Sequence, residues 1–232
     1  MDEISQRKGY RDFITMVANA ETGNLLEVID SHKQEEIIEA LKQQPLEVRE
    51  QVEGVSVDMW GGFPKVIAEV FPNAAVVIDR FHVMKLVNQR LNKLRQIVGI
   101  KAQGSRFLLL KNSEDLTEEE NQKLQQILSQ SPCLKMAYCI KEELREIYQT
   151  TITVKTGIIR MKKWLAQARV FYSRVARTIS THLQGICNYF ISRTTSGVME
   201  GINNKAKLIM RQGYGFTNMI SFRARLLGSF SD

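Results

Sequence analysis

The spacing of apolar residues changes once along the chain, near residue 82. Before that point the first 33 residues alternate as β-strands do and are broken by turn signals at Gly9 and over 21–24, which predicts three consecutive antiparallel strands. Four further elements are predicted in order: a helix over 34–43, a buried strand over 52–58, a short helix over 64–71 and an apolar strand over 74–78. This order predicts an α/β fold with a mixed sheet flanked by helices.

Long helices follow the strands. Apolar residues three and four apart predict one helix over 83–98, and Thr117 with Glu120 forms a capping-box signature at the start of a second. Pro132 predicts the start of a third helix, and the patterns over 158–172 and 175–191 predict two more. We therefore predict three parts: a core over 1–83, an all-helical insertion over 84–190, and a last segment over 191–232 that completes the core.

Charge is unevenly distributed. The 232 residues are 44% hydrophobic, which indicates a globular protein, and their net charge is +7. Residues 1–150 carry 19 Lys and Arg against 23 Asp and Glu, whereas residues 151–232 carry 13 against two, so the basic excess lies in the last third. Such an excess suggests a polyanionic partner.

Three cysteines without zinc-ligand spacing favour a reducing compartment and argue against a structural zinc site. The sequence has no signal-peptide pattern and no apolar run of about 18 residues. We expect a cytoplasmic protein with no membrane role.

Three carboxylates occupy positions that suit a metal ion. Asp58 directly follows an apolar strand pattern, Asp2 precedes the first strands, and Glu200 is a lone acidic residue in a basic stretch. Oxygen ligands of this kind suit Mg²⁺, with Mn²⁺ as the alternative, and predict phosphoryl-transfer chemistry. Each residue also has a plain structural interpretation: Asp58 as a cap of the next turn, and Glu200 as one half of a solvated ion pair.

Asp79 and His82 directly follow the second apolar strand, where both can face the same crevice. The alternative is that Asp79 caps the next helix and that His82 packs locally. Trp164 is assigned to the core. After Glu200, the predicted helix carries candidate contacts to a nucleic-acid backbone, with a solvated basic face as the alternative: Asn203, Lys205, Lys207 and Arg211.

At these residues the chain resembles the ISL-three family of DDE-class insertion-sequence transposases. Five ordered blocks carry the resemblance: Asp2-Glu3-Ile4 with Arg7-Lys8-Gly9; 57–61; Phe71-Pro72 with 79–83; 196–205; and 211–216. The resemblance implies a ribonuclease H-like core with a large helical insertion before the last catalytic helix. It also implies a metal-binding triad of Asp2, Asp58 and Glu200, with Asp79 and His82 beside it. Asp58 is preferred to Asp79 because the fourth strand of this fold carries the second ligand.

The implied activity is Mg²⁺-dependent cleavage and transfer of double-stranded DNA, by a homo-oligomer assembled on transposon ends and target. Family members usually begin with a cysteine-rich zinc-binding segment and a helix-turn-helix, so the chain is expected to be an N-terminally truncated element. Two alternatives remain: a ribonuclease H-like nuclease that cuts without joining, and an inactive DNA-binding remnant of a transposase.

Overall fold

The computed structural model describes residues 1–5, 13–59, 61–193, 197–213 and 218–230. The chain divides into two compact units. We call the first, made of Met1–Asp79 and Arg193–Asp232, the sheet unit, and the second, Arg80–Ser192, the helical unit. The sequence had placed the corresponding boundaries after residues 83 and 190.

The sheet unit begins with an antiparallel three-stranded sheet, as the alternating pattern predicted: β1 (Asp2–Ser5), β2 (Phe13–Ala18) and β3 (Leu25–Ile29). Asp2 is paired with Met16 in the register. The Asn19 side chain closes the turn from β2 to β3 by accepting hydrogen bonds from the backbone N–H groups of Glu21 (2.8 Å) and Thr22 (3.2 Å). Gly23 has a φ of 78° there, a conformation that favours glycine.

A second sheet in this unit is the parallel pair β4 (Gly54–Val57) and β5 (Ala75–Ile78), in which Val57 is paired with Ile78. Three helices precede or connect these strands: α1 (Gln34–Lys42), α2 (Leu46–Arg49) and α3 (Phe63–Val70). The sequence predicted all but α2, which buries no residue and therefore has no apolar periodicity to detect. The backbone nitrogen of Met1 donates to the carbonyl oxygen of Ser56 (2.7 Å), which connects the start of β1 to β4.

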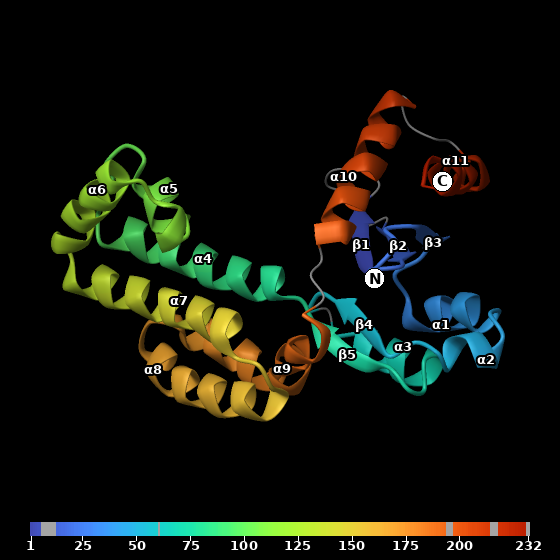
Figure 1. Ribbon diagram of the computed structural model, residues 1–232. Helices are drawn as coiled ribbons and strands as arrows, with labels where there is room; N and C mark the ends of the chain where they lie inside the picture. The colour runs from blue at the N-terminus through green and yellow to red at the C-terminus, as the bar shows by residue number, and fades with distance from the viewer. Residues whose placement is uncertain (6–12, 60, 194–196, 214–217, 231–232) are drawn as a thin grey trace. The chain divides into compact units, whose positions relative to one another are not determined.

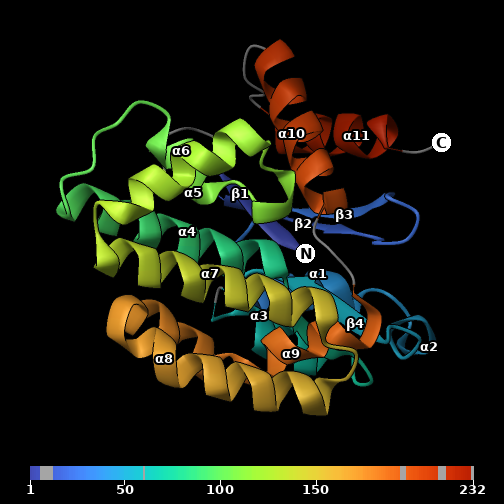
Figure 2. The same cartoon turned by 60° about the vertical axis from the view of Figure 1, so that its left-hand side comes forward.

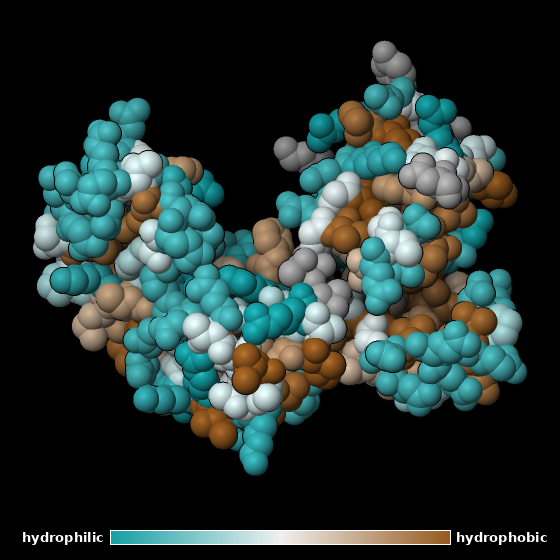
Figure 3. Space-filling view, in the orientation of Figure 1, coloured by the Kyte–Doolittle hydropathy of each residue, from teal (hydrophilic) through white to brown (hydrophobic). Residues whose placement is uncertain are grey.

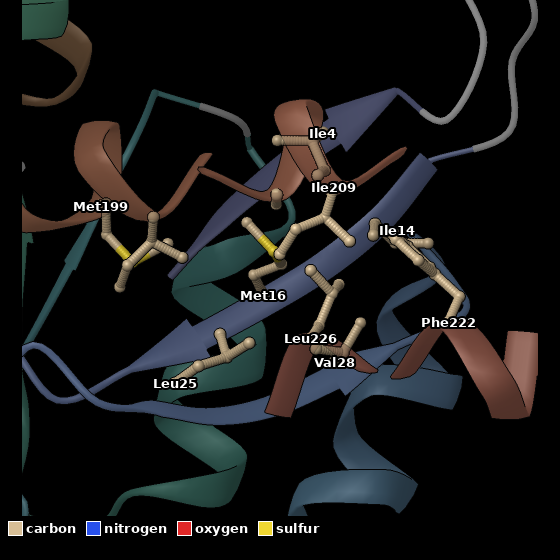
Figure 4. Packing of buried hydrophobic residues seen from close by; sticks show 11 residues of the cluster. Ile4, Ile14, Met16, Leu25, Val28, Met199, Ile209, Phe222 and Leu226 are labelled. Atoms are coloured by element: carbon tan, nitrogen blue, oxygen red, sulfur yellow. The ribbon is translucent and has the colours of Figure 1, made fainter. Parts of the chain in front are cut away.

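Two helices from the end of the chain, α10 (Gly197–Gln212) and α11 (Met219–Ser229), pack against the three-stranded sheet. Met199, Ile202 and Ile209 of α10 meet Ile4 and Met16 in one apolar cluster (Figure 4). The helix that carries Glu200 thus packs on the first strands of the chain.

The helical unit contains seven elements (Figures 1 and 2): α4 (Arg80–Ile97), α5 (Ser105–Leu110), the 3₁₀ helix η1 (Ser113–Asp115), α6 (Glu118–Ser129), α7 (Pro132–Thr150), α8 (Val154–Thr181) and α9 (Leu183–Ser192). The helices α4, α7 and α8 pack against one another, and α9 packs on α8. The predicted capping box of Thr117 and Glu120 is present. Within the described ranges, no helix is long and apolar enough to cross a membrane.

The patterns over 158–172 and 175–191 predicted a break between them, and a kink lies there: Tyr172, inside α8, departs from helical geometry (φ −122°, ψ 35°). The buried hydroxyl of Tyr172 donates to the carbonyl oxygen of Ala137 (2.7 Å) in α7. A second break, at His182 between α8 and α9, was not predicted. Trp164 lies in the core as predicted, with Nε1 donating to the carbonyl oxygen of Ile140 (2.8 Å).

Candidate active site

Asp2 is held at both of its carboxylate oxygens. Its Oδ1 accepts a hydrogen bond from the backbone N–H of Glu3 (2.8 Å), and its Oδ2 accepts one from the side-chain amide of Asn203 (2.6 Å). Asn203 lies in α10 and is only 8% exposed. Since side chains alternate along a strand, Asp2 shares the face of β1 on which Ile4 packs against α10. The contact therefore fixes the rotamer of Asp2 from a distant part of the sequence.

Glu200 lies one helical turn before Asn203. Residues three apart on a helix are neighbours, with about 5–6 Å between their Cβ atoms. Met199 and Ile202 face the sheet, whereas Glu200 is exposed. The packing of α10 thus presents Glu200 to solvent beside the residue that contacts Asp2.

Asp58 and Asp79 end neighbouring parallel strands. Asp58 directly follows β4 and Asp79 directly follows β5, and the backbone N–H of Asp79 donates to the carbonyl oxygen of Val57 (3.2 Å). Asp58 is half-buried, whereas Asp79 is 1% exposed. The two aspartates therefore share the carboxyl edge of this sheet, where α/β proteins place their ligands.

Glu3 is a further carboxylate in this region. Burial, followed by the nearby charges of Asp58 and Asp2, raises the pKa of Glu3 to about 7. Its Oε1 is buried and has no hydrogen-bond partner among the described groups. The charges of Asp2 and Asp58, which belong to different sheets, thus both act on Glu3.

His82 and the basic candidates have different surroundings. His82 lies in the first turn of α4, in the helical unit, where its ring meets Phe81 edge-on at 5.6 Å. Lys205 contacts α11: its Nζ donates to the carbonyl oxygen of Ser229 and lies 4.3 Å from the centre of the Phe230 ring. Lys207 and Arg211 are exposed along the same side of α10 as Glu200.

The donor set suits a hard cation, although within the described ranges no group of three or more His, Cys, Asp or Glu side chains is close enough to hold a metal ion. Glu3 Oε1 and Asn203 Oδ1 are buried oxygens without a hydrogen-bond partner in those same ranges. Carboxylate and amide oxygens are ligands that Mg²⁺ and Mn²⁺ prefer. The chemistry of these oxygens thus suits a divalent cation, but the described side chains do not come close enough together for three of them to hold one.

Sequence reasoning missed Glu3 and the contact between Asn203 and Asp2. The sequence shows that Asp2 and Glu3 are adjacent acidic residues, but it does not show the burial of Glu3. Asn203 was recognised as a neighbour of Glu200 on the helix and was predicted to contact DNA. In the structure its amide donates inward to Asp2.

Comparison with known proteins identifies the family. The model for ISL3-type DDE transposases, described as "Transposase", matches residues 1–226, so the chain belongs to this family. It is 25% identical over 247 residues to the transposase for insertion sequence element IS1001 of Bordetella parapertussis, which covers 99% of the chain. It is 26% identical over 252 residues to the transposase for IS1557 of Mycobacterium tuberculosis, which covers 93%. The chain spans 60% and 56% of the lengths of these relatives, and no solved structure matches.

Proposed function

We propose that this chain catalyses metal-dependent cleavage and transfer of DNA strands, the chemistry of insertion-sequence transposition, through Asp2, Asp58 and Glu200. The hydrogen bond from Asn203 to Asp2 carries the proposal, because it joins β1 to α10 one turn after Glu200. The first and last members of the triad thereby come from elements in direct contact. Membership of the transposase family and the relatives' names support the same reaction.

The proposal includes a ribonuclease H-like core. The two sheets would form one sheet in the order β3-β2-β1-β4-β5, and the helical unit would be an insertion between β5 and α10. Support comes from the hydrogen bond between Met1 and Ser56, which connects β1 to β4, and from the return of α10 to β1. In this arrangement Asp2 and Asp58 belong to adjacent strands.

Asp2, Asp58 and Glu200 would hold Mg²⁺ or Mn²⁺. A bound divalent cation supplies Lewis-acid stabilisation of charge on the phosphate and lowers the pKa of a bound water. The protein's own contribution is to hold the carboxylates ready. Each oxygen of Asp2 accepts one hydrogen bond from the protein, which leaves further lone pairs for a cation.

We assign Asn203 as a positioning residue. Its amide nitrogen fixes Asp2 Oδ2, and its buried Oδ1 has no hydrogen-bond partner among the described groups. Outer partners of this kind keep a metal ligand in one orientation. Burial leaves Asn203 little surface for DNA, so backbone contacts from α10 are proposed for Lys207 and Arg211, and Lys205 is proposed to support them by holding α11.

The partner would be double-stranded DNA, at element ends and at a target. Transfer of two ends requires two active sites close together, so a homo-oligomer on DNA is part of the proposal.

The test is plasmid nicking by the purified chain with Mg²⁺ or Mn²⁺. Nicking by the wild type, lost in Asp58→Asn and Glu200→Gln but kept in Glu21→Gln, is the expected result. Glu21 is a matched control because it is an exposed carboxylate in the β2–β3 turn of the same unit. Equal nicking by all four proteins, or by none, would contradict the assignment.

A strand-joining assay with precut ends separates the two enzymatic alternatives. Joined products support a transposase, and nicking without joined products indicates a nuclease. DNA binding without nicking indicates a binding remnant.

A further inference from the structure

The helical unit carries most of the chain's positive charge. It has 19 Lys and Arg against eight Asp and Glu, whereas the sheet unit has 13 against 17. The proposed catalytic residues thus belong to a unit of net charge −4, and the other unit has +11. Judged by net charge alone, a DNA duplex is attracted more strongly to the second unit than to the first.

Within the helical unit, α8 combines the most basic residues with no acidic ones. Its 28 residues include seven Lys or Arg and neither Asp nor Glu. All eight acidic residues of the unit lie over 114–146, before α8 begins. A solvated charged helix ordinarily mixes both signs, so this composition is unlike that of an ordinary surface helix.

The basic residues of α8 gather on one side. Its opposite side is buried against the unit's core by Trp164, Leu165 and Ala168 and their helical neighbours. At 100° per residue, the four basic side chains Lys155, Lys162, Lys163 and Arg169, which precede the kink at Tyr172, fall within one outward arc of about 120°. Together with Arg174 and Arg177 beyond the kink, these exposed residues define what we call the α8 basic face.

Among the described residues, none of these six side chains forms an ion pair. Among the residues that the structure describes, Arg160 is the member of α8 that forms an ion pair, with Glu146, and it lies outside the α8 basic face. In the space-filling view, hydrophilic side chains cover much of the visible helical unit, with small apolar areas between them (Figure 3). The part of the face before the kink at Tyr172, from Lys155 to Arg169, is about 21 Å long at 1.5 Å per residue.

We propose that the α8 basic face binds the phosphate backbone of duplex DNA without reading its sequence. The proposal rests on the proposed function for the identity of the polyanion. It requires no particular arrangement of the two units. The face would hold the duplex while the sheet unit supplies the carboxylates. Lys and Arg contacts to phosphate oxygens fix position and carry no base information.

The test is DNA binding in EDTA, so that its outcome does not depend on cleavage. A 30-base-pair duplex of arbitrary sequence is titrated at several salt concentrations with two variants of equal charge. The face variant is Lys162→Gln, Lys163→Gln, Arg169→Gln and Arg174→Gln. The control variant changes four other exposed basic residues of the helical unit to Gln: Lys101, Arg106, Lys123 and Lys135.

We expect the face variant to bind at least about tenfold more weakly at 0.1 M salt, with a log–log salt slope shallower by about 3 to 4. In the control variant the salt slope should become shallower by less than about a third of that amount, because the four charges that it removes act on the DNA only at long range. Equal losses in the two variants would overturn the proposal, since binding would then follow net charge alone. Unchanged thermal unfolding of both variants shows that the fold is kept.

A photo-crosslinking amino acid gives a second readout that does not change any charge. Ala166 lies within the α8 basic face, and Gln126 lies on the exposed side of α6. DNA crosslinks from position 166 and not from 126 are expected. Crosslinks from 166 to a second copy of the chain, or binding to anionic vesicles but not to DNA, would contradict a DNA-binding face.

Discussion

The two units of this transposase-family chain differ in how far apart in sequence their contacts reach and in the sign of their charge. In the sheet unit, α10 packs on strands from the start of the chain, and Asp2 is bonded to Asn203. In the helical unit, each α-helix from α4 to α8 contacts the α-helix that follows it in the sequence. The sheet unit is net acidic and the helical unit strongly basic.

This difference suggests a division of labour. Carboxylates that hold a cation must lie close together, which disfavours binding of DNA at the same place unless the metal is present. Under the proposed function, positive charge on a separate unit would attract the duplex.

The largest effect is expected for Asp58→Asn in the sheet unit. Loss of one ligand carboxylate should lower the single-turnover cleavage rate at saturating DNA at least about a thousandfold. DNA affinity in EDTA should stay the same or rise, because a negative charge is removed. A rate within tenfold of wild type would remove Asp58 from the site.

Asn203→Ala should have the next largest effect. Loss of an outer partner of a metal ligand typically costs about 10- to 100-fold in metal affinity or activity. The Mn²⁺ concentration for half-maximal rate should rise, and saturating Mn²⁺ should restore part of the rate. Asn204→Ala is the control, because Asn204 is exposed. An unchanged metal requirement with a lower melting temperature would mean that Asn203 is only structural.

In the helical unit, Gly157→Ala should lower stability. A Cβ at this position would lie 2.4 Å from Phe190 Cε2, where α8 and α9 pack closely. Overpacking of this kind costs about 1–3 kcal/mol, measured by urea unfolding. Gly228→Ala in α11 is the matched control, since in the described part of the chain no atom outside its own stretch of helix and its chain neighbours lies within 4 Å of the added Cβ. A neutral result for Gly157→Ala would mean that the helices separate easily.

The smallest effect is expected for Arg223→Met in α11. Its guanidinium donates two hydrogen bonds of 2.8 Å to Glu27 of β3, but the side chain is 45% exposed. An exposed ion pair contributes about 0–1 kcal/mol, and less at high salt. Urea unfolding at 0.05 and 0.5 M NaCl measures the loss of stability and its dependence on salt. A loss above 2 kcal/mol would show that this pair holds α11 to the sheet.

Much of the fold was predictable because local patterns coincide with tertiary packing. Ile37, Ile38 and Leu41 form the buried side of α1, and the Thr117 capping box starts α6. Asp58 was recognised because it follows an apolar strand. Each of these signals lies within a few residues of sequence.

The rest depended on contacts that no local pattern contains. The hydrogen bond from Asn203 to Asp2 joins residues that are 201 positions apart in the sequence. The raised pKa of Glu3 depends on burial and on Asp58. The charge difference between the units was not predicted. Along the sequence, the basic excess had been assigned to residues 151–232, whereas the compact units place it in Arg80–Ser192.

The most direct test of this division of labour is to measure affinity and cleavage rate on the same preparations. DNA affinity in EDTA and the cleavage rate at saturating DNA with Mn²⁺ are compared for Asp58→Asn and for the four-residue variant of the α8 basic face. We predict that Asp58→Asn loses the rate and keeps the affinity, whereas the face variant loses affinity and reaches the wild-type rate at saturation. Loss of both properties in either variant would contradict the separation of the two roles.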